Sequence, residues 1–324
     1  MDSRIRFHKT GGPEVLCVEA APAAEPGTGE ARVRQHAIGL NYIDIYHRSG
    51  LYPVPLPSGI GLEGAGVVEA VGANVADIKP GDRVAYAGGP LGAYATVRNI
   101  TSDRLVKLPD AISFEQGAAM MLKGLTAQYL LRRTYRVQPG DAILIHAAAG
   151  GTGLLVCQWA EALGATVIGT VGSEEKAALA KSHGCGHPIL YKRENVVERV
   201  KAITGGAGVA VVYDSVGKDT FMDSLNCLKP MGMMVSFGNA SGPVPPFETA
   251  LLAQKGSLYL TRPTLFAYAA KRDDLLAMAA ELFEVVQSGK VKIQIHQRHA
   301  LRDAVQAHRN LESRRTTGST ILVP

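Results

Sequence analysis

Asp141-Ala-Ile-Leu-Ile-His-Ala-Ala-Ala-Gly-Gly-Thr-Gly153 is the stretch of this chain that decides its fold. The run from Ala142 to Ile145 is short, apolar and β-branched, which predicts a buried parallel strand. A glycine cluster follows, and a nearly uncharged run of helix length then extends from Leu154 to Leu163. Strand, glycine turn and helix in this order bind a dinucleotide pyrophosphate, because glycines let the backbone approach the phosphates and a helix N-terminus supplies free N–H groups.

This turn matches the Gly-x-Gly-x-x-Gly pattern incompletely, because His146 to Ala148 stand where the first glycine is expected. A purely structural turn is the alternative interpretation, and the surrounding elements favour the dinucleotide site. From Asp141 onward, strands alternate with helices, which predicts a doubly wound α/β domain with its ligand at the carboxyl ends of the strands. The predicted strands are 142–146, 165–170, 187–190, 209–214 and 233–237, with Gly256 to Leu260 as a sixth, and the predicted helices are 153–163, 173–183, 194–203 and 218–228.

Residues 1–110 have a different pattern, which is β-rich with glycine turns. Ser113-Phe-Glu-Gln116 has the form of a capping box and predicts a helix through Met121, with another helix from Leu125 to Arg133. After Arg262-Pro263 we predict a helix from Asp273 to Ser288, a strand at 291–295 and a helix at about 301–312. We assign this tail to the first domain, because the cofactor sheet is already complete without it.

Composition places the chain among ordinary globular proteins. Its 324 residues exceed the usual size of a single core, so two domains are expected. Apolar runs do not reach the roughly 18 residues of a membrane helix, and the N-terminus lacks a signal-peptide core. The four cysteines form no C-x-x-C pair, which favours reduced thiols and a cytoplasmic location. The net charge of +5 fits a solvated surface or attraction of a phosphorylated ligand, and no nucleic-acid-binding motif is present.

The end of the second predicted strand indicates which nicotinamide cofactor is bound. An NAD-binding domain places an acidic residue there to hold the ribose hydroxyls. This chain has the uncharged Gly172 and Ser173, with Lys176 one turn into the next helix. Glycine leaves room for a 2′-phosphate, serine offers donors and lysine offers a cation. Tyr191 is expected on the adenine side, so the sequence predicts NADPH rather than NADH.

These motifs together resemble the medium-chain dehydrogenase/reductase superfamily, and specific segments resemble its zinc-free quinone oxidoreductases of the zeta-crystallin type. The resemblance extends along essentially the whole chain. It implies a β-rich GroES-like catalytic domain at 1–124, a Rossmann dinucleotide-binding domain at 125–262, and a return to the catalytic domain at 263–324. The segments that carry it are Asn41-Tyr-Ile-Asp-Ile-Tyr46, Arg48-Ser-Gly-Leu-Tyr52, Leu122-Lys-Gly-Leu-Thr126, Tyr213-Asp-Ser-Val-Gly217, Ser236-Phe-Gly-Asn239 and Leu311-Glu-Ser-Arg314.

The chain departs from the zinc-bearing alcohol dehydrogenases at the metal site. Those enzymes have a Cys where this chain has Asn41, and a Gly-His-Glu where it has Gly61-Leu62-Glu63. Two of the three protein ligands of a catalytic zinc are therefore missing, and no metal is expected. A quinone accepts hydride without a Lewis acid and aromatises on reduction, so the site has only to orient it and protect it from water.

The resemblance also implies the residues of the site. Tyr46 and Tyr52 are candidates to donate a hydrogen bond to the quinone oxygen, with help from Asn41, and each tyrosine has the alternative role of a pocket wall. Gly150, Gly151 and Thr152 are expected at the pyrophosphate. The rest of the predicted cofactor shell is Tyr42, Ile43, Asp44, Ile45, Tyr46, Thr126, Gly172, Ser173, Lys176, Tyr191, Ser215, Gly238, Asn239, Arg262 and Arg314.

The predicted function is zinc-independent reduction of a quinone by NADPH. The same site can deliver hydride to an α,β-unsaturated ketone or aldehyde, which is the first alternative. An RNA-binding or crystallin-like role is the second, and the lack of a continuous basic stripe disfavours it. Gly256 to Thr261 is expected at the edge of the cofactor sheet, and an uncovered edge pairs readily with a second copy, so a homodimer is predicted.

Overall fold

The computed structural model describes residues 2–324 and divides the chain into two units. Unit 1 contains the residues up to Leu125, together with Ala269–Gln287 and Ile293–Pro324. Unit 2 contains Thr126–Tyr268 and the short segment Ser288–Lys292. The first boundary falls inside helix α2 (Phe114–Tyr129), and the chain returns to unit 1 after Tyr268.

Unit 2 is the doubly wound α/β domain that the sequence predicts. Its six-stranded sheet has the order β11-β10-β9-β12-β13-β14, and every neighbouring pair is parallel. The order reverses between β9 and β12, which is the position where such sheets bind ligands. The strands are β9 (Ala142–Ile145), β10 (Thr166–Val171), β11 (His187–Leu190), β12 (Val209–Asp214), β13 (Leu228–Ser236) and β14 (Tyr259–Thr261).

Helices alternate with these strands. Helices α5 and α6 contribute Val200, Phe221 and Leu225 to an apolar cluster with the sheet residues Ile168 and Val212, so they cover the same face. The helices of unit 2 are α3 (Gly151–Ala162), α4 (Glu174–Lys181), α5 (Val196–Ile203), α6 (Phe221–Cys227), α7 (Ala250–Gln254) and α8 (Leu265–Tyr268), with one further turn, η3 (Leu130–Thr134), directly after α2.

Unit 1 is β-rich, as the sequence of its first 110 residues predicts. A larger sheet has the order β15-β16-β3-β5-β6-β8, with β7 paired to β3, and a smaller sheet has the order β2-β1-β4. Its strands are β1 (Ser3–Phe7), β2 (Cys17–Ala20), β3 (Glu30–Leu40), β4 (Ser58–Gly59), β5 (Glu63–Val71), β6 (Arg83–Ala87), β7 (Val97–Thr101), β8 (Val106–Lys107), β15 (Ile295–Ala300) and β16 (Ser319–Val323).

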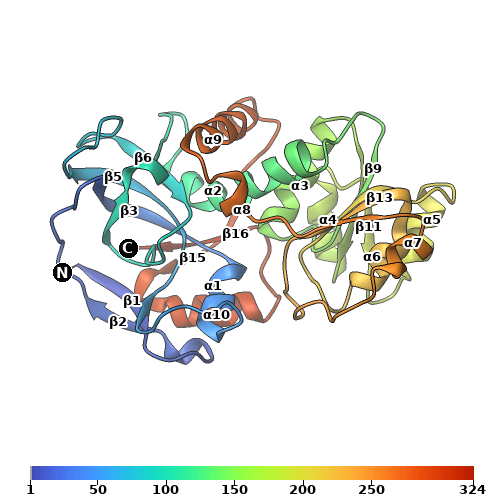
Figure 1. The fold of residues 1–324 in the computed structure, drawn as a ribbon, viewed down its shortest axis with the longest axis horizontal. Coiled ribbons are helices and arrows are strands. Elements are labelled where there is room, and N and C mark those ends of the chain that lie inside the picture. Colours follow the sequence, from blue (N-terminus) through green and yellow to red (C-terminus); the bar gives the residue numbers. More distant parts are fainter. Residues whose placement is uncertain (1) are drawn as a thin grey trace. The chain divides into compact units, whose positions relative to one another are not determined.

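The helices of unit 1 come from both ends of the chain. Helix α1 (Tyr42–Ser49) follows β3 directly and is linked to α10 (Ala304–Glu312) through Arg48, which hydrogen-bonds His308 and Glu312. Figure 1 shows the blue α1 next to the red α10, so the C-terminal segment supports the helix nearest the predicted quinone residues. The other helical segments are α9 (Arg272–Gln287), η1 (Pro13–Val15), η2 (Ser102–Arg104) and η4 (Leu301–Asp303).

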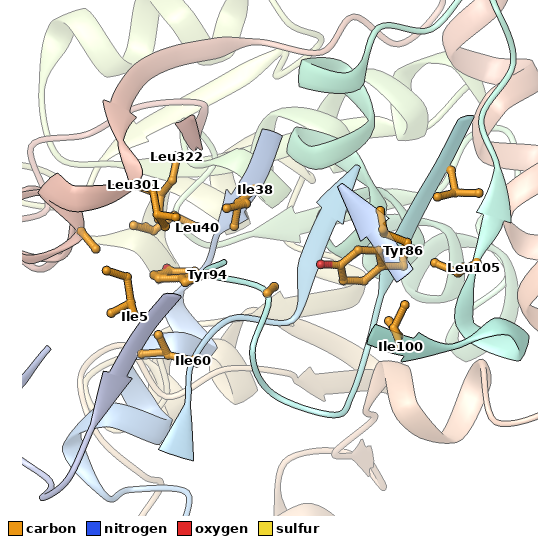
Figure 2. Close-up of a cluster of buried hydrophobic side chains, with 14 of the residues drawn as sticks. Ile5, Ile38, Leu40, Ile60, Tyr86, Tyr94, Ile100, Leu105, Leu301 and Leu322 are labelled. Carbon is orange, nitrogen blue, oxygen red and sulfur yellow. The ribbon is translucent and has the colours of Figure 1, made fainter. Parts of the chain in front are cut away.

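The core of unit 1 joins its N-terminal strands to the C-terminal tail. In Figure 2 the Tyr94 ring lies among Ile5, Leu40, Leu301 and Leu322, all of them buried. Strand β16 hydrogen-bonds β3 in antiparallel fashion, with Ile321 opposite Gly39. The tail is therefore part of this core.

Three sequence predictions need correction. The helix through Met121 and the helix from Leu125 to Arg133 are one helix, α2, that continues into η3. The helix continues through Gly124, where the missing side chain lets Leu282 pack closely against the helix. A Cβ at this position would lie 2.6 Å from Leu282 Cδ1. The strand expected at 291–295 is β15, which begins at Ile295. Strand β16 was not predicted at all.

The helices of residues 2–324 include none that is both long and apolar enough to span a bilayer.

Candidate active site

The glycine turn connects β9 to α3 as predicted. Gly150 is the N-cap residue of α3, and the first backbone bond of the helix runs from Leu154 N–H to Gly150 C=O at 2.9 Å. The N–H groups of Gly151 to Gly153 precede that bond and are available to an anion. Gly153 has no room for a side chain, because a Cβ would lie 2.3 Å from the Ala147 carbonyl oxygen. Two of the predicted pyrophosphate residues, Gly151 and Thr152, are thus in the first turn of α3.

The tip of β10 brings together the residues predicted for the 2′-phosphate. Ser173 caps α4 by accepting a hydrogen bond from the Lys176 N–H at 3.4 Å. Burial and the nearby charge of Lys192 lower the pKa of Lys176. Arg193 is ion-paired with Glu174 at 3.0 Å, and Lys176 and Lys192 are two further cations of this region. Two cations that repel each other favour a bound anion.

Gly172 and Tyr191 are direct neighbours at the same tip. A Cβ on Gly172 would lie 3.0 Å from the Tyr191 hydroxyl oxygen, so the ring covers this glycine. Tyr191 follows β11 immediately and is 49% exposed. An aromatic ring that is anchored on one side and open on the other can receive a flat base.

A buried hydrogen-bond chain, which the sequence did not predict, crosses the carboxyl ends of three strands. His146 Nδ1 lies 2.9 Å from Thr170 Oγ1, and His146 Nε2 lies 2.9 Å from Ser224 Oγ. Ser224 donates its only hydroxyl hydrogen to Asp214 Oδ2 at 2.8 Å, so its oxygen accepts from His146 Nε2–H. Nδ1 then accepts from Thr170, and burial lowers the pKa of His146, which keeps it neutral.

The direction of this chain excludes a nucleophilic serine. In a hydrolase the histidine accepts the serine proton, whereas here the histidine donates to the serine. Asp214 also accepts the N–H groups of Val216 and Gly217 at 2.8 and 3.0 Å. The chain therefore fixes the loop of the predicted cofactor residue Ser215 relative to β9 and β10.

Apart from Thr126, the remaining predicted residues of unit 2 lie near the end of β13 or contact it. Gly238 packs on Ser215, because a Cβ on Gly238 would lie 2.4 Å from the Ser215 carbonyl oxygen. Arg262 donates to the Ser236 carbonyl oxygen at 2.8 Å. The strand end that carries Asn239 is thereby tied to both Ser215 and Arg262. Thr126 is buried in α2.

In unit 1 the predicted quinone residues gather around α1. The Tyr46 ring is 5.1 Å from the Tyr52 ring and 6.0 Å from the Tyr42 ring, between centroids. Tyr46 is buried, at 8% exposure. Burial raises the pKa of Tyr42, and the Arg314 guanidinium opposes this rise. Ile43, Asp44 and Ile45 are the other three residues of the predicted stretch, and they also belong to α1.

Asn41 is held between two buried carboxylates. Its backbone N–H donates to Asp44 Oδ2 at 2.9 Å, the return bond of a capping box. Its side-chain Nδ2 donates to Glu63 Oε2 at 2.8 Å. Lys123 Nζ donates to the same oxygen at 3.1 Å, and the Leu122 N–H donates to Glu63 Oε1 at 2.7 Å. The amide of Asn41 therefore has one defined orientation.

These residues do not fit a catalytic zinc. An asparagine amide and the aliphatic Leu62 are not among its usual ligands. Glu63 is fully buried and already paired with the Lys123 ammonium. A second cation beside that ammonium would be repelled. Within residues 2–324, the one group of three possible metal ligands is His8, Cys17 and Glu19, which lies elsewhere, on the β1–β2 hairpin and the residue after β1.

Asp44 belongs to a second buried chain. Tyr94 donates to Asp44 Oδ2 at 2.9 Å, so its oxygen accepts from His308 Nε2–H at 3.2 Å. Arg48 Nη1 donates to His308 Nδ1 at 3.3 Å and is ion-paired with Glu312. Burial raises the pKa of Asp44 to about 7, and burial with the Arg48 charge lowers that of His308 to about 3. The chain connects the cap of α1 to α10.

Known proteins are similar to this chain over its whole length. Residues 27–110 match the model of the alcohol dehydrogenase GroES-like domain, and residues 151–281 match that of the zinc-binding dehydrogenases. A quinone oxidoreductase of Pseudomonas aeruginosa is 59% identical, with 100% of both chains covered. The crystal structure of the Escherichia coli quinone oxidoreductase complexed with NADPH has a TM-score of 0.98 at 54% identity, covering 99% of this chain and 100% of that one. A 2-haloacrylate reductase of a Burkholderia species is 45% identical over 98% of both chains.

Proposed function

Because the chain belongs to the quinone oxidoreductase family of the medium-chain dehydrogenases/reductases, we propose that it transfers reducing equivalents from NADPH to a quinone without zinc. The observation that carries this function is Asn41 and Leu62 at positions where a zinc site needs Cys and His, with Glu63 paired to Lys123. Quinones need no Lewis acid, so this is the substrate class that the residues serve best.

NADPH is the cofactor, and different residues of unit 2 would bind its pyrophosphate, its 2′-phosphate and its adenine. The first turn of α3 would hold the pyrophosphate through Gly151 and Thr152. Ser173, Lys176 and Lys192 would hold the 2′-phosphate, because no carboxylate of β10 repels it. Tyr191 would receive the adenine. The bound nucleotide supplies the hydride, and the protein supplies binding, orientation and exclusion of water.

In unit 1, the rings of Tyr46 and Tyr52 would form the wall against which a quinone stacks. Their centroid distance of 5.1 Å and edge-to-face arrangement hold both rings in place. Either hydroxyl can donate to a quinone oxygen, as the resemblance implies.

A second candidate substrate class is an activated alkene. The observation in its favour is the 2-haloacrylate reductase at 45% identity over nearly the full length. Hydride delivery to a C=C bond conjugated with a carbonyl group produces negative charge on that carbonyl oxygen, as quinone reduction does. One electrophilic site can therefore serve both reactions.

A homodimer is the proposed assembly. Strand β14 is the last strand of the sheet, and its Tyr259 and Leu260 are 60% and 36% exposed. Met231 in β13 and Phe266 in α8 are also exposed, at 68% and 48%. A free strand edge with apolar side chains favours pairing with the same edge of a second copy.

A substrate panel tests the proposed function. NADPH oxidation is measured with ortho-quinones, para-quinones, enones and 2-haloacrylate, and NADH replaces NADPH as the cofactor control. Highest kcat/KM with quinones and NADPH is expected. Turnover with alkenes alone would replace the first candidate by the second.

A further inference from the structure

We propose that Lys123 and Asn41 together bind the carbonyl oxygen of the substrate, and that Lys123 is a catalytic residue that stabilises the negative charge developing there. This inference rests on the proposed function and names a group that the sequence did not identify. All its residues belong to unit 1: Asn41 precedes α1, Glu63 begins β5, and Lys123 lies in α2.

Lys123 is a buried ammonium with hydrogens to spare. The residue is 6% exposed, which is exceptional for lysine. It has three N–H donors, and one is used by Glu63 Oε2 at 3.1 Å. No other residue in the described part of the chain accepts a hydrogen bond from Nζ. A buried cation with unused donors needs an acceptor, because leaving them unmet is costly.

Asn41 has a spare donor beside it. The residue is 5% exposed, and its amide nitrogen has two hydrogens, of which one is used by Glu63 Oε2 at 2.8 Å. Within residues 2–324 no acceptor is bound by the second. Since Asn41 Nδ2 and Lys123 Nζ bond the same carboxylate oxygen, they are near neighbours. Two neighbouring donors, one of them charged, are the arrangement that binds a carbonyl oxygen on which charge accumulates.

Glu63 makes this arrangement stable without neutralising its effect. The carboxylate is fully buried and accepts three hydrogen bonds, from Leu122 N–H, Asn41 and Lys123. These three donors stabilise the carboxylate, and the carboxylate in turn holds the Lys123 ammonium in place. The ion pair has no net charge, so a neutral carbonyl group can approach it. The negative charge formed later on the substrate oxygen is attracted by the nearer ammonium.

The chemistry balances with the established cofactor. Hydride transfer brings an electron pair to the acceptor, breaks a C–H bond of the reduced nicotinamide, and leaves one negative charge on the acceptor's carbonyl oxygen. Lys123 and Asn41 donate hydrogen bonds to that oxygen throughout. A proton from solvent then completes the hydroquinone, while the nucleotide is left oxidised. Lys123 keeps its own proton and needs no regeneration.

The test removes the ammonium of Lys123 together with the carboxylate of Glu63, so that no buried charge is left without its partner. The double variant Glu63→Gln with Lys123→Met replaces a buried ion pair by neutral side chains of similar size, a change that buried pairs often tolerate. The matched control is Asp82→Asn with Lys107→Met, because Lys107 and Asp82 also form an ion pair at 3.1 Å in unit 1. The measurements are kcat with a para-quinone, and the Kd of NADPH from its fluorescence.

We expect kcat to fall about 10²–10³-fold in the first double variant and to stay unchanged in the control, as for loss of an oxyanion donor. The Kd of NADPH should stay within about twofold in both. If the first variant retains the wild-type kcat, the ion pair is structural and the proposal is wrong. A wild-type enzyme that reduces no quinone would instead overturn the proposed function.

A second variant decides the matter if the double variant does not fold. Asn41→Ser keeps a good helix cap and leaves no buried charge unpaired, but it removes the amide donor. A roughly 10-fold lower kcat, with unchanged Kd for NADPH, is expected. An unchanged kcat in this variant would overturn the paired-donor site.

Discussion

The hydroxyl oxygen of Tyr191 lies over Gly172, 3.0 Å from the place where a Cβ of that residue would stand. Position 172 therefore has two roles at the tip of β10. Gly172 has no carboxylate that would repel a 2′-phosphate, and the absence of a side chain lets the Tyr191 ring pack against the backbone. Phosphate recognition and base recognition are assigned to different side chains here, which makes them separable by mutation.

Changing Tyr191→Ala should weaken the binding of both NADPH and NADH. Loss of a stacking ring typically costs about 1–3 kcal/mol, which corresponds to roughly 5- to 150-fold in affinity. The Kd values of NADPH and NADH, measured by fluorescence, should rise by the same factor. Tyr191→Phe keeps the ring and should leave both nearly unchanged. A loss confined to NADPH would show that the hydroxyl group binds the phosphate.

Changing Lys176→Ala should weaken the binding of NADPH but not that of NADH. A partly exposed lysine–phosphate contact contributes about 1–3 kcal/mol, so the KM for NADPH should rise by roughly one to two orders of magnitude. The KM for NADH and both kcat values should hardly move, and high salt should reduce the wild-type preference. Lys181→Ala, an exposed lysine of the same helix, is the control. Equal losses with both nucleotides would assign Lys176 to general binding.

The pair Asp44 and His308 should have opposite effects on the pH dependence of stability. The folded pKa of Asp44, about 7, exceeds the unfolded value of 3.8, so the native state binds the extra proton and this group destabilises it as pH rises from about 4 to 7. The folded pKa of His308, about 3, is below 6.5, so its contribution stabilises the native state as pH rises from about 3 to 6.5. In the wild type the two slopes largely cancel.

Single variants should separate these slopes. Urea unfolding between pH 4 and 7 is expected to show Asp44→Asn gaining stability relative to wild type as pH rises. His308→Asn should lose stability relative to wild type over the same range. Each difference amounts to at most a few kcal/mol, at 1.36 kcal/mol per pKa unit. Parallel pH profiles for all three proteins would mean that neither group titrates anomalously.

Changing Leu260→Lys should dissociate the proposed dimer. The substitution puts a charge on the edge strand β14, where Leu260 is 36% exposed and pairs with Met234 of β13. Sedimentation at micromolar concentration should give a dimer for the wild type and a monomer for the variant. Leu276→Lys, on α9 and also exposed, is the control and should remain dimeric. A wild-type monomer would contradict the proposed assembly.

Much of unit 2 was predictable because its signals are local. Each signal spans only a few neighbouring residues: the apolar run of β9, the glycines after it, and the capping residue Ser173. Strand β15 was misplaced because His296 to His299 are all polar, so the sequence has no apolar–polar alternation there, although burial alternates along the strand in the structure. Strand β16 is a five-residue strand between β15, which was itself misplaced, and β3, which lies far away in the sequence.

The polar networks were not predictable, because their members meet only in the fold. Lys123 is 60 positions from Glu63, and Ser224 is 78 positions from His146. A lysine inside a helix is most often a solvated residue, and no spacing rule marks this one as buried. The carboxylate at position 63 was visible only as the remainder of a zinc motif. Its ion-pair partner, Lys123, could be identified only from the three-dimensional structure.

The most direct test of a zinc-independent NADPH:quinone reductase is the steady-state rate of NADPH oxidation with a para-quinone after metal removal. The purified protein is treated with a strong chelator, and its zinc content is measured by elemental analysis before and after. An unchanged kcat at substoichiometric zinc is the expected result, because Asn41 and Leu62 are not among the usual ligands of zinc and Lys123 already supplies a cation to Glu63. Stoichiometric zinc in the active protein, with turnover lost on chelation and regained on adding zinc, would contradict it.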